Sequence, residues 1–328
     1  MINNKKNILK NTMLKNKLTI IIMYHYVRPI KNSKYERLRG LELHKFRRQL
    51  DFLSTRYNFV TAEQVIEHCL KKKKLPNNPC YLTFDDGLKD HYKYVMPELL
   101  KRNIQGSFFP SAEAIEKKKL LDVHAIHFIL ASVKNTNKLY KYFIGVCQKN
   151  GLMKKDLIFW YKLYGKPYLY TNGNFENPKI AYIKKLLQFV LPEKIRSKII
   201  LILLKKYVGE NSNRLAKKLY MSVSEVKKLI KNKMYVGSHG YNHVWLNKLS
   251  RLKQEKEINK SLNFLNKIGS KTKNWIMCYP FGGFDENTIR ILKKKHCALA
   301  LTTNSGIAKL ESSKFLLLNR FDTNDFPQ

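Results

Sequence analysis

The chain has 328 residues, of which 44% are hydrophobic and 12% aromatic, so its composition excludes a disordered chain and permits one large α/β domain or two smaller domains. Lys and Arg number 63 against 24 Asp and Glu, and the resulting formal charge of +39 would suit nucleic acid, an anionic membrane or a phosphorylated substrate. Because much of the excess Lys is scattered beside Asn, and the compact runs such as 71–74 lack interleaved aromatic residues, we expect no specific nucleic-acid partner, while attraction to phosphate or anionic lipid stays open.

The cysteines and the first apolar segment bear on the compartment. The five cysteines are odd in number, widely spaced and without a CxxC pair, so they indicate neither a disulfide framework nor a cysteine metal site. Residues 18–27 follow a basic stretch, as in a signal peptide, but they are short, rich in β-branched residues and lack a small-residue cleavage site. They therefore predict a buried first strand, and we expect a cytoplasmic protein, with peripheral contact at an anionic membrane surface left open.

Strand and helix patterns alternate along most of the chain. Helical spacing starts near Leu43, a capping box opens a second helix at Thr61 with Gln64, and a third helix covers 250–268 with Gly269 as its C-cap. Strands that alternate with helices and read as continuous apolar runs predict a parallel sheet buried on both faces. The predicted strands are 18–23, 81–84, 106–109, 235–238, 275–279, 298–302 and 315–318.

This rhythm stops between about Lys117 and Lys233, where strand signals vanish and amphipathic helices follow one another, among them 180–190 and 195–208. The pattern predicts a large helical insertion, 118–232, between a first part of one domain, 1–117, and its second part, 233–328. Without the insertion, roughly 210 residues remain, about the size of a compact (β/α) barrel.

The first segment whose side chains could take part in catalysis is a strand that ends in Asp85 and Asp86, followed by a turn at Gly87 and a helix. In parallel α/β folds the functional groups lie where strands end, and two adjacent carboxylates repel each other unless something compensates them. A metal ion is such a compensation, because one carboxylate can bind it while the other stays charged to accept a proton. Taken alone, Asp-Asp-Gly also fits an ordinary surface turn.

A second strand end carries His239 and His243, four residues apart. Imidazoles at this spacing can reach one cation at about 2.0 to 2.1 Å each, although single histidines are usually structural or surface residues. With Asp86 they would supply two nitrogens and one oxygen and leave positions open for water and substrate. We therefore expect one divalent metal ion, with Zn²⁺ as the first choice and other first-row ions also admitted.

Four segments together resemble the polysaccharide deacetylases, the NodB-homology or carbohydrate esterase family 4 group. They are TFDDG at 83–87, SHGYNH at 238–243, YPFGG at 279–283 and FLLLNRFD at 315–322. MYHYV at 23–27 and LELHKFRRQLDFL at 41–53 are similar to the variant whose members deacetylate poly-N-acetylglucosamine or modify surface-polysaccharide sugars. The resemblance implies an α/β fold, a distorted (β/α)7 barrel of parallel strands that carries the helical insertion.

The resemblance also implies roles for individual residues. Asp85 corresponds to the general base, and Asp86, His239 and His243 correspond to the metal ligands. The YPFGG segment corresponds to the substrate-binding motif, with Tyr279, Phe281 and Gly282 at the site and the Phe281 N–H as a donor to the oxyanion.

Two family positions are filled differently in this sequence. The Arg that orients the base in the family is replaced by Cys278, and Arg320 is the candidate to hold Asp85 instead, unless it is an ordinary surface charge. The Leu-x-His motif that carries the general acid has no histidine, so the acid is unassigned. His25 is the first candidate by position, a structural histidine being the alternative, and His124 and His127 are weaker ones.

These residues predict a hydrolase that removes an N-acetyl or other acyl group from an amino sugar, nucleotide-linked or lipid-linked, in glycan synthesis. The alternatives are an idle sugar-binding module of the same fold and, on charge alone, a nucleic-acid-binding protein. The insertion is expected to act as a lid or an acceptor-binding subdomain, or simply to pack its aromatic residues: Trp160, Tyr161, Tyr164, Tyr168 and Tyr170.

Overall fold

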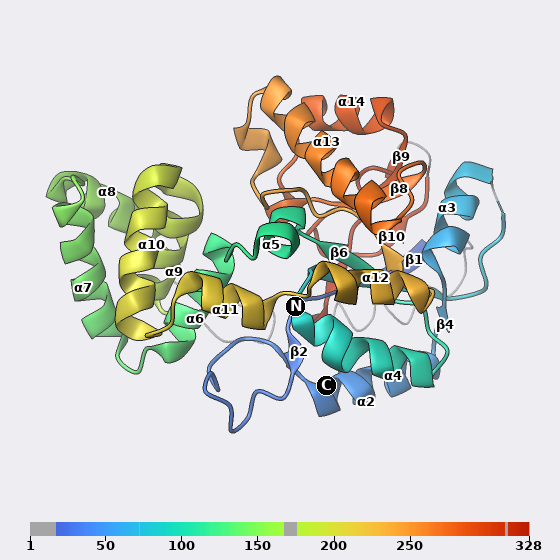
Figure 1. Cartoon of the computed structure of the whole chain (residues 1–328), viewed down its shortest axis with the longest axis horizontal. Coiled ribbons are helices and arrows are strands. Elements are labelled where there is room, and N and C mark those ends of the chain that lie inside the picture. Colours follow the sequence, from blue (N-terminus) through green and yellow to red (C-terminus); the bar gives the residue numbers. More distant parts are fainter. Residues whose placement is uncertain (1–17, 72, 167–175, 312–313, 328) are drawn as a thin grey trace. The chain divides into compact units, whose positions relative to one another are not determined.

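The computed structural model describes residues 18–71, 73–166, 176–311 and 314–327 (Figure 1). The chain divides into two compact units. The first unit comprises residues 1–28, 41–117 and 219–328, and the second comprises 29–40 and 118–218. Among the described residues, no helix combines the length and the apolar character that crossing a bilayer requires.

Four parallel strands form the centre of the first unit. They lie in the order β1 (Leu18–Tyr24), β5 (Pro79–Asp86), β6 (Ser107–Pro110) and β7 (Tyr235–Val236). Every residue of β5 is buried, as expected of a parallel strand covered on both faces. The predicted α/β fold with parallel strands is therefore confirmed.

Shorter strands extend this arrangement. Three of them complete the seven-stranded sheet: β4 (Asn58–Phe59) beside β5, and β10 (Ala308–Lys309) and β11 (Phe321–Asp322) beside β1. Two-stranded sheets pair β8 (Trp275–Cys278) with β9 (Cys297–Leu301), and β2 (Val27–Arg28) with β3 (Leu41–Glu42). Single bridges join Ser238 to Met277 and Leu301 to Leu318.

The predicted strand at 315–318 is wrong. The chain turns there, with the Leu317 N–H donating to the Lys314 carbonyl, and only Leu318 makes a strand bridge. The Leu316 carbonyl accepts a hydrogen bond from the Tyr279 hydroxyl, so this apolar run covers the core as a turn. The paired residues come later, at Phe321–Asp322.

The predicted helix boundaries of the first unit agree with the structure. Thr61 and Gln64 exchange backbone-to-side-chain hydrogen bonds of 2.8 and 3.1 Å, as in a capping box, and Gly269 ends α13 in the left-handed conformation. Figure 1 shows α13 and α14 side by side. The helices are α2 (Leu43–Ser54), α3 (Ala62–Lys71), a π-helical turn (His91–Val95), α4 (Met96–Lys101), α5 (Ala112–Lys117), α12 (Val223–Lys231), α13 (Arg251–Ile268), α14 (Glu286–Lys294) and 3-10 turns at Leu246–Lys248, Pro280–Gly282 and Thr323–Asp325.

The second unit is helical in the described part of 118–218, while residues 29–40 form turns. Its elements are α6 (Asp122–Ser132), α7 (Thr136–Lys149), α8 (Lys154–Tyr164), α9 (Pro178–Lys185), a π-helical turn (Leu186–Val190), α10 (Glu193–Tyr207) and α11 (Ser212–Leu219). The predicted boundary at residue 232 differs from this division, because α12 belongs to the first unit and 29–40 belongs to the second. Tyr168 and Tyr170 lie outside the described residues.

Candidate active site

The candidate site lies where the parallel strands of the first unit end. Asp85 and Asp86 are the last residues of β5, and His25 directly follows β1, whose Tyr24 pairs with Phe84. His239 follows the single bridge that Ser238 makes with β8. Because parallel strands end at one edge, residues far apart in the sequence meet there.

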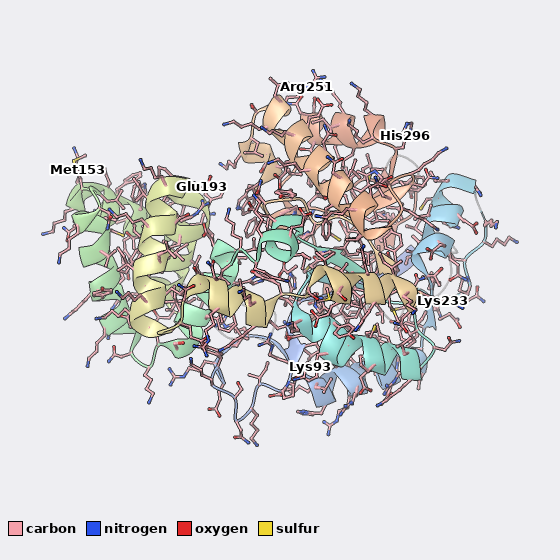
Figure 2. All side chains as sticks on the ribbon, viewed as in Figure 1. Lys93, Met153, Glu193, Lys233, Arg251 and His296 are labelled. Atoms are coloured by element: carbon pink, nitrogen blue, oxygen red, sulfur yellow. The ribbon has the colours of Figure 1, made fainter. Side chains whose placement is uncertain are left out.

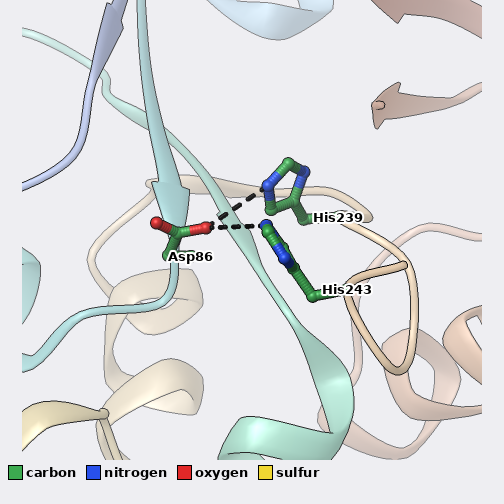
Figure 3. A group of neighbouring side chains, drawn as sticks. All are labelled: Asp86, His239 and His243. Atoms are coloured by element: carbon green, nitrogen blue, oxygen red, sulfur yellow. Dashed lines mark ion pairs between the residues drawn. The ribbon is translucent and has the colours of Figure 1, made fainter. Parts of the chain in front are cut away.

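Asp86, His239 and His243 converge on one point, as Figure 3 shows. The Asp86 Oδ1 atom lies 3.4 Å from Nε2 of His239 and 3.3 Å from Nε2 of His243. Two ligands bound to Zn²⁺ at about 2.0–2.1 Å in tetrahedral geometry lie roughly 3.3–3.4 Å apart. The two oxygen-to-nitrogen distances match that spacing, and the three donor atoms all lie within 4.8 Å of one another, so this group is a candidate site for a single divalent ion.

The ring of His239 is oriented by the strand next to it. Its Nδ1–H donates to the Cys278 carbonyl at 2.9 Å, which leaves Nε2 facing Asp86 as an acceptor. Such a hydrogen bond fixes the tautomer that a metal-binding imidazole needs.

The backbone is strained at two of these three residues. Asp86 has φ 74° and His243 has φ 55°, in the left-handed region that residues other than Gly seldom adopt, at a cost of about 1–3 kcal/mol each. Gly87 follows with φ 73°, and a Cβ there would lie 2.6 Å from the Pro110 side chain, so this turn requires Gly.

A buried carboxylate on α13 holds the loop between the two histidines. The Glu257 side chain accepts hydrogen bonds from the backbone N–H groups of Tyr241 (2.8 Å) and Asn242 (2.5 Å) and from the Asn242 amide (2.7 Å). Sequence reasoning missed Glu257 because it reads as one more charge on a helix rich in Lys and Glu. The hydrogen bonds that Glu257 makes with the loop explain how His243 keeps its strained conformation.

Asp85 does not belong to the converging group and pairs with Arg320 instead. The Arg320 Nη1–H donates to Asp85 Oδ1 at 3.0 Å, Nη2 forms an ion pair with Oδ2 at 2.8 Å, and both side chains are almost fully buried. Its Nε–H donates to the Thr302 carbonyl at 2.9 Å, and it contacts Cys278 Sγ at 3.5 Å. Arg320 therefore lies beside Cys278, the position where the family has its Arg, and the alternative of a surface charge is excluded.

The Arg320 contact controls the charge of Asp85. Burial favours the neutral acid and is the largest influence, but Arg320 and His239 together outweigh it and hold the pKa of Asp85 below its ordinary value. Asp85 is therefore an ionised carboxylate beside, but outside, the group of three.

The YPFGG segment contributes one side chain at the site and one in the core. The Phe281 ring contacts the His243 ring edge-on and stacks on Trp245, with centroids 4.5 and 5.0 Å apart. Phe281 and Gly282 have φ 56° and 71°, so their turn is left-handed. The Tyr279 side chain is fully buried and bonds to the Leu316 carbonyl, so it lies away from where a substrate contact would be.

The candidate acids differ in their surroundings. His25 is half-buried and lies close enough to Asp85 to lower the pKa of that carboxyl. His91, which sequence reasoning missed, is fully buried, donates from Nε2 to the His25 carbonyl at 2.9 Å, and has its pKa lowered to about 4 by burial. Neutral His91 therefore holds the chain segment of His25. His124 and His127 lie in the second unit, in contact with each other.

Comparisons with known proteins agree with this geometry. The family model for polysaccharide deacetylases matches residues 187–299, which include both histidines of the group and the YPFGG segment. No curated protein matches the sequence.

Several solved structures share the fold. The deacetylase PplD of Streptococcus pyogenes, in complex with acetate, has a TM-score of 0.56 at 18% identity over 94% of this chain and 93% of its own. IcaB of Ammonifex degensii has a TM-score of 0.55 at 16% identity, covering 95% and 94% of the two chains. A de-N-acetylase of Aggregatibacter actinomycetemcomitans has a TM-score of 0.53 at 14% identity, covering 93% and 94%. At these identities the likeness establishes the fold.

Proposed function

We propose that the chain is a polysaccharide deacetylase, which hydrolyses the N-acyl group of an amino sugar with one divalent metal ion; the family model that matches residues 187–299 and the fold shared with solved deacetylases support this. The observation that carries the proposal is that a candidate metal site and a separate ionised carboxylate lie side by side at the end of β5. Asp86, His239 and His243 face a common point, and the neighbouring Asp85 is ionised and held by Arg320.

The metal ligands would be Asp86, His239 and His243, and Zn²⁺ suits this set of one oxygen and two nitrogen donors. When bound, the ion would supply a Lewis acid for the amide carbonyl and lower the pKa of a water molecule.

The chain's own residues perform the proton transfers. Asp85 accepts a proton from the attacking water, and the hydrogen bond and the ion pair with Arg320 keep it in one orientation during the transfer. The Phe281 N–H is a candidate donor to the oxyanion of the tetrahedral intermediate. His25, half-buried beside Asp85, is our candidate for the acid that protonates the departing sugar amine.

The proposed substrate is an N-acetylated sugar of a surface glycan or of its nucleotide-linked or lipid-linked precursor, and the proposed compartment is the cytoplasm. Two observations support this class. The relatives with the same fold are named deacetylases or a de-N-acetylase, and residues 23–27 and 41–53 are similar to the surface-glycan variant of the family. A nucleic-acid partner has no comparable support.

Release of acetate from N-acetylglucosamine oligomers and from nucleotide-linked and lipid-linked N-acetylated sugars tests the proposal. Activity should disappear on chelation, return with Zn²⁺, and fall by about 10³-fold or more in Asp85→Asn, because the base is lost. Asp51→Asn is the matched control, since that carboxylate is 66% exposed and its ion pair is with Arg102, away from the group of three.

Two results would contradict the proposal. If Asp85→Asn retained full activity, Asp85 would not be the base. If the native protein bound these sugars with metal present but released no acetate over long incubation, the idle sugar-binding module would replace the enzyme.

A further inference from the structure

One face of helix α8, its inner face, packs against other helices of the second unit. Leu157 is buried, and Trp160, Tyr161 and Tyr164 are half-buried at the spacing of one helix face. The Tyr161 ring contacts the rings of Tyr140 and Tyr182, with centroids 5.5 and 5.2 Å apart. These aromatics therefore pack within the unit, which accounts for their number without a substrate.

The opposite face of α8 is also apolar, but it is exposed. Ile158, Phe159 and Leu163 are 47%, 62% and 48% exposed, although burial is what such side chains favour. Met153, labelled in Figure 2, precedes the helix, projects outward and is 55% exposed. These four residues account for four of the nine large exposed hydrophobic side chains among the described residues, within eleven positions of the sequence.

Lysines accompany this apolar stripe on the same face. Lys155 and Lys162 are exposed and alternate with the apolar residues at helical spacing, so the outer face reads 155, 158, 159, 162 and 163, and exposed Lys166 follows just after the end of the helix. Lys154 is exposed at the start of the helix, and the acidic residue of α8, Asp156, is half-buried. The outer face is therefore both apolar and basic.

This composition discriminates between possible partners. The centres of protein interfaces are depleted in Lys, because a desolvated ammonium group is costly there. Helices that lie in a membrane interface combine Lys on their margins with Phe, Leu and Ile that enter the acyl boundary, and the Lys stems extend toward lipid phosphates. The apolar area is small and the flanking charge high, as in reversible binding to anionic lipid.

We propose that the outer face of α8 (Lys155, Ile158, Phe159, Lys162 and Leu163), together with Met153 just before the helix and Lys166 just after it, binds the surface of an anionic lipid bilayer. The apolar side chains would insert into the bilayer surface, and the lysines would be attracted to the anionic head groups. Salt weakens this electrostatic attraction. This proposal does not rest on the proposed hydrolase activity.

The test is co-sedimentation of the full chain with phosphatidylcholine vesicles that contain or lack phosphatidylglycerol. We expect binding to the anionic vesicles that weakens as salt is added. The triple variant I158Q/F159Q/L163Q should bind roughly tenfold or more weakly, because three insertable side chains are lost. K155Q/K162Q/K166Q should lose about fivefold for each removed charge at low salt.

Matched controls use equally exposed residues elsewhere in the chain. Leu70, Leu100 and Leu252 are 46%, 43% and 79% exposed, so L70Q/L100Q/L252Q changes as many exposed apolar groups without touching α8. K253Q/K256Q/K294Q removes three exposed charges from α13 and α14. Both controls should bind within about twofold of the native chain, and circular dichroism and the melting temperature should show that every variant is folded.

Three outcomes would overturn the proposal. Equal losses in the control and α8 variants would mean that general charge, not this face, attracts the vesicles. Absence of binding by the native chain would remove the lipid partner. A native dimer that I158Q/F159Q/L163Q converts to monomer in sedimentation velocity, without a change in lipid binding, would identify a second copy of the chain as the occupant.

Discussion

Replacement of Arg320 by Met tests whether the Asp85–Arg320 pair is the central electrostatic element of the site. Arg320 is 1% exposed and makes two contacts of 2.8–3.0 Å with Asp85, and its Nε–H donates to the Thr302 carbonyl. Met fills most of the volume but leaves the buried carboxylate without its cation. Breaking a buried pair on one side costs about 3–5 kcal/mol in the free energy of unfolding.

The second change in the cycle is Asp85→Asn. It removes the uncompensated charge, so the double variant Asp85→Asn/Arg320→Met should be more stable than Arg320→Met alone, by roughly 1–3 kcal/mol. Arg320→Lys should fall between Arg320→Met and the native chain, because Lys keeps the charge but loses the two-pronged geometry.

Urea unfolding followed by circular dichroism measures these differences, with unchanged m-values as the condition for comparison. The control is Arg290→Met, since Arg290 pairs with Glu286 at the surface, with side chains 70% and 87% exposed, and should cost less than about 1 kcal/mol. The reasoning is refuted if Arg320→Met costs no more than Arg290→Met, or if the added Asp85→Asn restores nothing.

Three further predictions concern the metal, the loop and pH. In calorimetry, chelation should lower the melting temperature of the native chain. Metal present at 100 times its Kd stabilises the fold by about 2.7 kcal/mol, and chelation removes this contribution. The melting temperature of Asp86→Asn should change little on chelation, and an equal decrease would show that Asp86 is not a metal ligand. Glu257→Ala should weaken Zn²⁺ affinity about 10-fold or more in competition titrations, because the loop between the two histidines loses three hydrogen bonds. Glu257→Gln should keep most of the affinity. Unchanged affinity in Glu257→Ala would show that Glu257 does not hold this loop for metal binding. Hydrogen bonds from Lys34 and Lys218 lower the pKa of Glu210 from 4.5 to about 2, so its contribution is complete above pH 4.5 and is lost as pH falls toward 2. The pH dependence of unfolding should then differ between the native chain and Glu210→Gln by about 1 kcal/mol, mostly in that window, and parallel curves would refute it.

The sequence by itself revealed the resemblance to the polysaccharide deacetylases and the residues able to take part in catalysis or metal binding. Asp85 and Asp86 could be singled out because adjacent carboxylates after a buried strand are unfavourable without a function, and His239 and His243 because four positions separate them. The parallel α/β class followed from apolar runs that alternate with helices. Each of these signals lies within a few residues of chain, where the pattern is local.

Tertiary structure decided which groups meet. Asp86 and His239 are about 150 positions apart, and Arg320 could be named only as a candidate for the place vacated at Cys278. Its contact with Asp85 depends on where β11 pairs with β1, which no local pattern encodes. Glu257 and His91 were missed for the same reason, since their partners lie on other elements.

Burial and boundaries also came from the fold alone. An apolar run at 315–318 satisfies the local pattern of a strand, yet it turns. The Leu316 carbonyl accepts a hydrogen bond from the Tyr279 hydroxyl, while the Phe315 carbonyl and the Leu318 N–H both bond to Ala300 of β9. The aromatic residues of α8 could have lined a substrate site or packed, and Tyr161 packs because α9 brings Tyr182 against it. Local sequence sets which side chains are apolar, but which of them find a partner depends on contacts between segments that the chain brings together only on folding.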